Sequence, residues 1–294
     1  MKPLIKLMKN KKGVIIIGSL HYDLFVNAHH QPKRGEIVLG KNWFPKFGGK
    51  GGNQALACSL NGTPTKIVSA VGKDEFGNYI LNKLKASKVN SKFVQILKNE
   101  ETGMSVAISD NKGEYGAVIV SGANLKIDHN VLKNPYIWKN SKILMIQNEI
   151  NEKLNLLAAK KAKLNGLKVC LNASPPKKLN LKLIQNVDIL IVNLVEAESI
   201  AQKKIKNISK AKQISQILTK QFELVVITAG EKGVIACEKN KKPIYLKPKK
   251  TKVKSTHGAG DVFAGVFCSN LALNQNIKTA LEIANKKAAF HVAK

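Results

Sequence analysis

The chain has 294 residues, 44% of them hydrophobic and 23% charged, which excludes wholesale disorder and fits one large domain or two small ones. The net charge is +30, yet only one of the 49 basic residues, Arg34, is an arginine. Phosphate and base recognition favours the bidentate arginine fork, so we expect lysine-rich solvated faces and no nucleic-acid partner. A nucleic-acid binder is the least favoured function.

The four cysteines have no close pair and no metal-type spacing, so we expect reduced core residues of a cytoplasmic protein. No apolar run reaches the roughly 18–20 residues of a membrane span, so no membrane partner is expected. The basic N-terminus lacks the apolar core of a secretory signal and favours a short surface extension.

The N-terminal half predicts strands mixed with helices. Residues 13–19 form an apolar run closed by glycine, which is typical of a buried central strand. Residues 21–47 alternate and predict short antiparallel strands, and residues 53–61 predict a helix that opens from a glycine-rich turn. Further predicted elements are a strand at 66–72, a helix at 74–88 with an acidic first turn, and strands at 92–98, 103–109 and 115–120.

From residue 142 the pattern alternates between strands and helices, which implies a parallel sheet with right-handed crossovers. The predicted strands are 142–147, 167–172, 188–192, 224–228 and 233–237; the predicted helices are 152–165, 196–203, 209–221, 259–272 and 277–292. The basic stretch 239–254 predicts exposed hairpin strands. The fold class is therefore α/β, a mainly parallel sheet flanked by helices in a single domain over 1–294, with a small antiparallel lid from about 21–47 and 92–119.

The first segment suited to ligand binding is Gly48-Gly49-Lys50-Gly51-Gly52-Asn53, directly before a predicted helix. Its glycines let backbone N–H groups approach a ligand closely, and Lys50 and Asn53 add polar side chains. The spacing matches neither the Walker A loop nor the dinucleotide fingerprint. So many glycines have a high cost in folding entropy unless a ligand requires them, which favours a binding loop.

The second segment is the small-residue run at 255–261, which leads into an apolar helix. The helix N-terminal amides, at Gly258, Ala259 and Gly260, and the helix dipole form an anion hole. Asp261 lies in the first turn at the same positive end, which is expected to keep its carboxylate ionised. We therefore expect Asp261 to take a proton from a substrate hydroxyl as general base.

The Gly-Gly-Lys-Gly-x-Asn-Gln loop and the Thr-x-Gly-Ala-Gly-Asp turn resemble the two signatures of the ribokinase-like (PfkB) carbohydrate kinase family. They lie in the family order, roughly 200 residues apart. The resemblance runs from about Val14 to about Ala289. It implies the ribokinase-like fold, ATP and a small-molecule sugar as substrates, and Mg²⁺ as cofactor.

The resemblance also implies roles for individual residues. The implied sugar-binding residues are His21, Asp23, Gly48, Gly49, Lys50, Asn53 and Glu149. The implied nucleotide-binding residues are Asn193, Thr228, Gly230, Gly233 and Asn285, and Glu196 of the Asn-x-x-Glu pattern is implied for Mg²⁺. These polar side chains suit an acceptor with several hydroxyls, and one acid acting through water is enough for Mg²⁺.

Two departures from the family pattern change the expectations. Ser255 stands where the family has an aspartate that contributes to the sugar site and a nearby K⁺ site. The chain also ends at Lys294, without the family segment that wraps the nucleotide and supplies K⁺ ligands. We therefore expect weakened K⁺ activation, a more open adenine pocket and an altered sugar preference.

The predicted function is ATP-dependent phosphorylation of a hydroxymethyl group of a small sugar, with ribose as the first candidate. The near alternative is a nucleoside or other hydroxyl-compound kinase of the same family, which His21 and Ser255 leave open. An alternative of another class is a sugar-binding regulatory protein with little turnover. The exposed strand edges of the predicted lid either pair with a second copy of the chain, which gives a homodimer, or are covered by other parts of the same chain.

Overall fold

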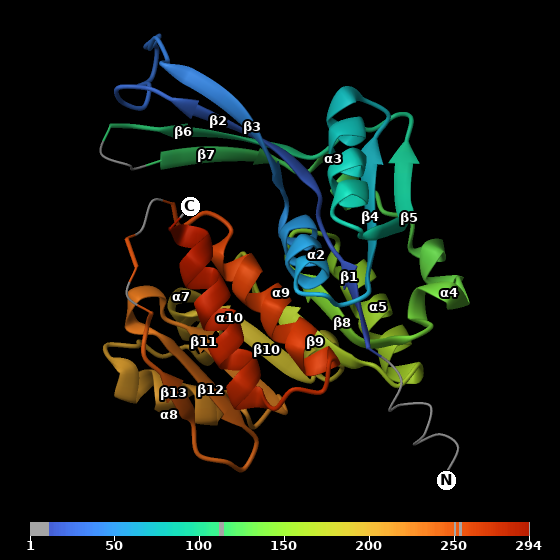
Figure 1. Cartoon of the computed structure of the whole chain (residues 1–294), viewed down its shortest axis with the longest axis vertical. Helices are drawn as coiled ribbons and strands as arrows, with labels where there is room; N and C mark the ends of the chain where they lie inside the picture. Colours follow the sequence, from blue (N-terminus) through green and yellow to red (C-terminus); the bar gives the residue numbers. More distant parts are fainter. Residues whose placement is uncertain (1–11, 112–114, 250, 253–254, 294) are drawn as a thin grey trace.

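The computed structural model describes residues 12–111, 115–249, 251–252 and 255–293, in which one large and one small sheet are formed (Figure 1). The predicted N-terminal extension, residues 112–114 of the lid, and residues 250 and 253–254 of the basic stretch lie outside this part. The order of the large sheet is β13-β12-β11-β10-β9-β8-β1-β4-β5. Its strands are β1 (Gly13–Ile17), β4 (Thr65–Gly72), β5 (Asn90–Leu97), β8 (Ser141–Gln147), β9 (Lys168–Asn172), β10 (Ile189–Asn193), β11 (Leu224–Thr228), β12 (Val234–Glu238) and β13 (Ile244–Leu246).

All neighbouring pairs from β5 to β11 are parallel. For β8 to β11, the alternation of strands and helices from residue 142 predicts this arrangement. The β11–β12 and β12–β13 pairs are antiparallel, so the expectation of a parallel strand at 233–237 was wrong. Only the short 3₁₀ helix η3 (Gly230–Lys232) connects β11 to β12. A parallel crossover needs a dozen or more residues, and the chain therefore turns back on itself here.

Helices cover both faces of the large sheet, because alternate residues of its buried strands point to opposite sides. Val14 and Ile16 face one apolar cluster and Ile15 and Ile17 face the other. The first cluster includes α2 (Lys50–Leu60), α3 (Glu75–Ala86), α9 (Ala259–Ala272) and α10 (Ile277–Val292). The second includes α4 (Pro135–Trp138), α5 (Glu152–Leu164), α6 (Leu181–Ile184), α7 (Leu194–Ala201) and α8 (Ile208–Leu218).

Every helix that the sequence predicts is present, and the unpredicted helices of the described residues are short. These are α4, α6 and the 3₁₀ helices η1 (Gly122–Leu125), η2 (His129–Lys133) and η3. A single turn is too short to show helical periodicity in a sequence. Within the described residues, no helix combines the length and the apolar character that crossing a membrane requires.

The small sheet forms the lid at the top of Figure 1, in the order β3-β2-β6-β7. Its strands are β2 (His21–Asn27), β3 (Asn42–Gly48), β6 (Met104–Ser109) and β7 (Tyr115–Val120). The β2–β3 and β6–β7 pairs are antiparallel hairpins, and β2 and β6 join them in parallel. The lid segment predicted at 92–119 was too long, because residues 92–97 belong to β5 and pair with β4 in the large sheet.

Candidate active site

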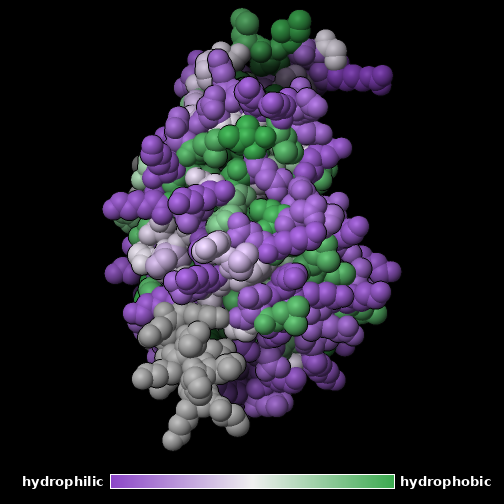
Figure 2. All heavy atoms as spheres, turned by 90° about the vertical axis from the view of Figure 1, so that its right-hand side faces the viewer, coloured by the Kyte–Doolittle hydropathy of each residue, from purple (hydrophilic) through white to green (hydrophobic). Residues whose placement is uncertain are grey.

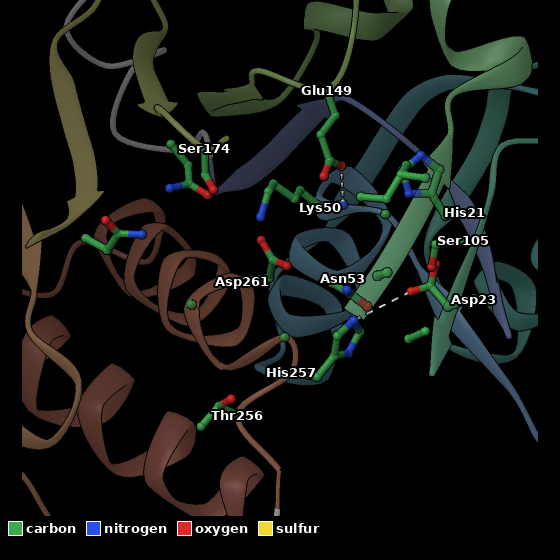
Figure 3. Close-up of a pocket in the computed structure, with 18 of the residues that line it drawn as sticks. His21, Asp23, Lys50, Asn53, Ser105, Glu149, Ser174, Thr256, His257 and Asp261 are labelled. Carbon is green, nitrogen blue, oxygen red and sulfur yellow. Dashed lines mark hydrogen bonds and ion pairs between the residues drawn. The ribbon is translucent and has the colours of Figure 1, made fainter. Parts of the chain in front are cut away.

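One cavity of about 460 Å³ opens where the lid meets the carboxyl ends of the central strands (Figure 3). Ligands of open α/β sheets commonly bind at this edge. The cavity brings together most of the predicted site residues, from segments far apart in the sequence. Those that line it are His21, Asp23, Gly49, Lys50, Asn53, Glu149, Asn193, Glu196, Thr228, Gly258, Gly260 and Asp261.

The glycine-rich segment places the N-terminus of α2 against the end of β1. Helix α2 begins at Lys50, and Gly49 before it has a φ of 82°. A Cβ on Gly51 would lie 2.6 Å from the backbone carbon of Gly18. The glycines therefore serve a close approach of two backbones, and this contact brings Lys50 and Asn53 to the cavity.

The second segment forms a tight turn that starts α9. Gly258 is the N-cap of α9 with a φ of 74°, in the left-handed region that glycine adopts readily. The Ala259 amide donates to Thr256 O at 3.2 Å, so Ala259 does not offer its N–H as expected. Among the described residues, the amides of Gly258, Gly260 and Asp261 have no protein acceptor. These three amides are therefore the open donors at this positive helix end.

Asp261 is buried in the first turn of α9, where opposing effects act on its carboxyl group. Burial is the largest effect and raises the pKa of Asp261 from 3.8 to about 6. The charge of Lys50 and the hydrogen bond from Gln54 act in the opposite direction, and the charge of Glu149 raises the pKa further. The expected stabilisation of the carboxylate by the helix end is therefore outweighed by desolvation. With a pKa of about 6, Asp261 is still mostly ionised at neutral pH.

Buried amide side chains hold Asp261 in place. Gln54 Nε2 donates to Asp261 Oδ1 and to Asn172 Oδ1, both at 3.0 Å. Gln54 Oε1 in turn accepts a hydrogen bond from Gln147 Nε2 at 2.7 Å. Because Gln54 is fully buried and bonded at both ends of its amide, it fixes the orientation of the carboxylate.

The lid supplies the acidic side chain on the far side of the cavity. The period of two along β2 places His21, Asp23 and Phe25 toward the cavity and Tyr22 and Leu24 on the outer face. Asp23 pairs in register with Ser105 of β6, whose hydroxyl donates to Asp23 Oδ1 at 2.6 Å. Asp23 is therefore a buried carboxylate held in one orientation, as the sugar-binding prediction requires.

His21 and Glu149 both line the cavity, but they differ in whether their polar atoms have hydrogen-bond partners. His21 is 3% exposed, and its Nε2 has no hydrogen-bond partner in the described structure. Glu149 Oε2 accepts hydrogen bonds from the Ser19 hydroxyl and from the Lys50 amide, the latter at 3.0 Å. The N-terminus of α2 thus orients Glu149, while Nε2 of His21 is buried without a partner.

The predicted nucleotide side lies at the ends of β10 and β11. Asn193 and Glu196 form a capping box at the start of α7, because Glu196 Oε2 accepts from the Asn193 amide at 2.8 Å and the Asn193 side chain accepts from the Glu196 amide. Both side chains also line the cavity, as does Thr228. Glu196 therefore has a structural role in addition to the predicted metal role.

Five predicted site residues do not line the cavity: Gly48, Ala259, Gly230, Gly233 and Asn285. Gly233 has a φ of 96°, and a Cβ there would lie 2.2 Å from Leu246 O. Asn285 Nδ2 donates to Lys247 O at 3.1 Å. The nucleotide-binding roles of Gly230, Gly233 and Asn285 stay predictions, and so does the sugar-binding role of Gly48.

The cavity also contains polar residues that the sequence analysis did not select: Ser105, Asn172, Ser174, Thr256 and His257. Asn172 is the last residue of β9, and Ser174 lies two residues beyond it. Polar residues at the carboxyl end of a parallel strand are a usable signal for such a site. Ser105 carries no comparable local signal, because only its register against Asp23 brings it to the site.

Comparison with known proteins agrees with this geometry. The pfkB family carbohydrate kinases match residues 11–294. A ribokinase of Dictyostelium discoideum is 30% identical over 97% of this chain and 95% of its own length. A ribokinase of Mus musculus is 31% identical over 96% of this chain and 88% of its own length.

The fold has a close counterpart among solved structures. The structure of Arabidopsis thaliana ribokinase complexed with ribose and ATP superimposes with a TM-score of 0.88 at 27% identity. The match covers 96% of this chain and 92% of the plant chain. The chain therefore belongs to the pfkB family of carbohydrate kinases.

Proposed function

We propose that this sugar kinase transfers the γ-phosphoryl group of ATP to a primary hydroxyl of a small sugar, with ribose as the first candidate. One observation carries the proposal: a single cavity joins the buried base Asp261, the open amides at the start of α9 and the carboxylates Asp23 and Glu149. The ribokinases among its relatives support ribose as the acceptor.

The chemistry that these groups perform is an in-line displacement. Asp261 accepts the proton of the attacking hydroxyl, whose oxygen forms a bond to the γ-phosphorus while the bond to the ADP oxygen breaks. The amides of Gly260 and Asp261 donate to the transferred phosphoryl oxygens as charge builds on them. The Lys50 side chain lies beside Asp261 and adds positive charge at the same place (Figure 3). The lid side of the cavity excludes water from this reaction.

Oxygen donors on the nucleotide side fit a Mg²⁺ ion that accompanies ATP. Glu196 is 3% exposed and lines the cavity. Asn193, three residues earlier, also lines the cavity and has an amide oxygen in its side chain. Mg²⁺ prefers oxygen ligands, keeps several waters and needs only one or two carboxylates besides the phosphates. Within the described residues no cluster of three His, Cys, Asp or Glu side chains forms a metal site of its own. Glu196 and Asn193 would hold the ion, which neutralises phosphate charge when bound.

The surface and the cysteines support a proposal for the assembly and the location of the enzyme. The outer face of the lid carries an apolar hollow lined by Tyr22, Leu24, Val26 and Trp43, and Trp43 is 66% exposed. This face supports a homodimer in which two lids pack together. The four cysteines are free and buried, which supports a reducing compartment such as the cytoplasm.

The test is an ADP-release assay of the purified protein with ATP, Mg²⁺ and a panel of pentoses, hexoses and nucleosides. We expect ribose or a close analogue to give the highest kcat/KM. Asp261→Asn should lower kcat by about 10²–10⁴-fold, because it removes the base without changing the shape of the site. A circular dichroism spectrum should show that this variant is folded.

The other outcomes of the assay would change the acceptor, the function or the residue assigned as the base. A nucleoside that exceeds every free sugar would replace ribose as the acceptor. Tight sugar binding without ADP release would indicate a regulatory protein and would overturn the proposal. Wild-type activity in Asp261→Asn would show that another group is the base.

A further inference from the structure

Two polar atoms face each other across the boundary between the lid and the turn before α9. Asp23 Oδ2 lies 3.7 Å from His257 Nε2, while Asp23 Oδ1 is engaged by Ser105 (Figure 3). This separation is too long for a direct hydrogen bond. Both side chains line the cavity. The pair therefore presents a carboxylate oxygen and a ring nitrogen side by side toward a ligand.

Their surroundings hold both groups in place. The His257 ring stands edge-on to Phe25, with 5.1 Å between the centroids and 84° between the planes. His291 Nε2 lies 2.9 Å from the backbone oxygen of His257 and ties the turn to α10. Asp23 is 4% exposed and fixed by its bond to Ser105. A pair that is ordered before binding costs little further entropy when a ligand arrives.

We infer that His257 is a specificity-determining residue, and that His257 Nε2 and Asp23 Oδ2 together clamp one hydroxyl group of the acceptor. The hydroxyl donates its hydrogen to the Asp23 carboxylate and accepts a hydrogen bond from the N–H of His257. An oxygen atom about 2.8 Å from each partner fits between atoms at this separation. The inference rests on the proposed function, because the clamped group belongs to the acceptor sugar.

The charge state of His257 suits this role. Burial lowers the pKa of His257 from its usual value, and the charges of Lys46 on β3, Lys50 on α2 and His291 on α10 act in the same direction. The charge of Asp23 on β2 opposes them without reversing the shift. A neutral imidazole does not close on Asp23 as an ion pair at neutral pH. Its N–H then remains available to a substrate hydroxyl.

The experiment compares wild type with His257→Phe and His257→Gln. Phenylalanine keeps an aromatic ring against Phe25 but lacks Nε2, and glutamine carries an N–H donor at a similar reach. Each protein is assayed with ATP, Mg²⁺, the best sugar and all monodeoxy analogues of that sugar. We expect His257→Phe to raise KM for the sugar about tenfold, because the loss of one hydrogen bond weakens binding by about this factor. The change in kcat should be smaller. His257→Gln should restore most of the affinity.

The monodeoxy series separates a clamp from a packing effect. One analogue should be a poor substrate of wild type, and His257→Phe should not weaken it further, because it lacks the clamped hydroxyl. The control variant His129→Phe, at a side chain that is 54% exposed on η2, should match wild type. A KM that does not change in His257→Phe, or that rises equally for every analogue, would overturn the clamp.

Failure of the proposed function would look different. In that case wild type would release no ADP with any acceptor. Calorimetric titration of the same analogues into wild type and His257→Phe would then still test the clamp. Equal affinities of the two proteins for all analogues would overturn it.

Discussion

At the residue scale, the pKa of the proposed base Asp261 depends on a balance between burial and polar contacts. Desolvation raises its pKa to about 6, and the hydrogen bond from Gln54 and the charge of Lys50 limit the rise. A base with a pKa near the working pH combines a large ionised fraction with useful basicity. With Asp261 as the proposed base, we expect the side chains that surround its carboxylate to set the pH range of catalysis.

Replacing Gln54 tests this balance. Gln54→Met keeps the length of the side chain but removes the donor to Asp261 Oδ1. Activity requires the ionised base, so wild-type kcat/KM should fall about tenfold per pH unit below pH 6. Without the Gln54 hydrogen bond the pKa of Asp261 rises, so the acid limb should move to higher pH and kcat should fall about 10–100-fold.

A pH profile of kcat/KM measures both effects. Gln95→Met is the matched control, because Gln95 lies on β5 and bonds the backbone of Asp128 away from the cavity. It should leave the acid limb in place. An unchanged acid limb in Gln54→Met would show that Gln54 does not act on the base.

The sequence predicts site residues where a local motif carries the chemistry. Asp261 and Lys50 belong to such motifs, and both line the cavity. Gln54 stands inside the same glycine-rich motif, but its role depends on Asn172 and Gln147, which only the fold brings near. His257 has no sequence signal beyond its place in the turn, since its partner Asp23 comes from the lid. Local patterns therefore identify candidate reactive groups, and tertiary contacts decide which residues orient these groups and shift their pKa values.

At the element scale, the sequence predicts which segments are strands but not how they pair. Residues 92–98 are predicted as a strand of the lid, yet the neighbour of β5 is β4 in the large sheet and not a lid strand. Periodicity records which residues are buried and carries no information on the partner across the hydrogen bonds. The antiparallel turn from β11 to β12 was missed although the sequence carries a signal for it, because the four residues between the predicted strands are too few for a parallel crossover.

The packing of α2 on the end of β1 yields a prediction at this scale. Gly51→Ala places a Cβ 2.6 Å from the backbone of Gly18, which cannot move as a flexible side chain can. The N-terminus of α2 must therefore shift, and the Lys50 amide loses its bond to Glu149. We expect a loss of about 1–3 kcal/mol in the free energy of unfolding and a strong loss of activity.

Thermal unfolding and kcat/KM measure the two effects. Gly40→Ala is the matched control, because a Cβ at Gly40 meets its nearest atom at 3.4 Å, an ordinary contact. It should change neither quantity by much. Normal stability and activity in Gly51→Ala would show that the close approach of α2 is not required.

At the scale of the whole molecule, the net charge opposes the association of two copies of the chain, while the apolar outer face of the lid favours it. Hydrophilic side chains cover most of the face in Figure 2, in keeping with the net charge of +30. Two such molecules repel each other, and the repulsion weakens with salt because ions screen it. The exposed apolar side chains of the outer lid, such as Trp43, favour contact.

We therefore expect a dimer that strengthens as salt is added. Sedimentation of the wild type at micromolar concentration should give about twice the monomer mass, with more dimer at high than at low salt. Trp43→Lys adds a charge to the lid face and should give monomers. Leu164→Lys is the control, since Leu164 is 81% exposed at the end of α5. A monomeric wild type at all salt concentrations would exclude the dimer.

The parallel pairing of β2 with β6 also determines when the site can assemble. The contact between Asp23 and Ser105 joins residues 82 positions apart, with β4, α3 and β5 between them in the chain. Closing so large a loop is slow unless the intervening segment has already become compact. The large sheet is therefore expected to form before the lid, and we expect the lid wall of the cavity to be the last part to gain its shape during folding.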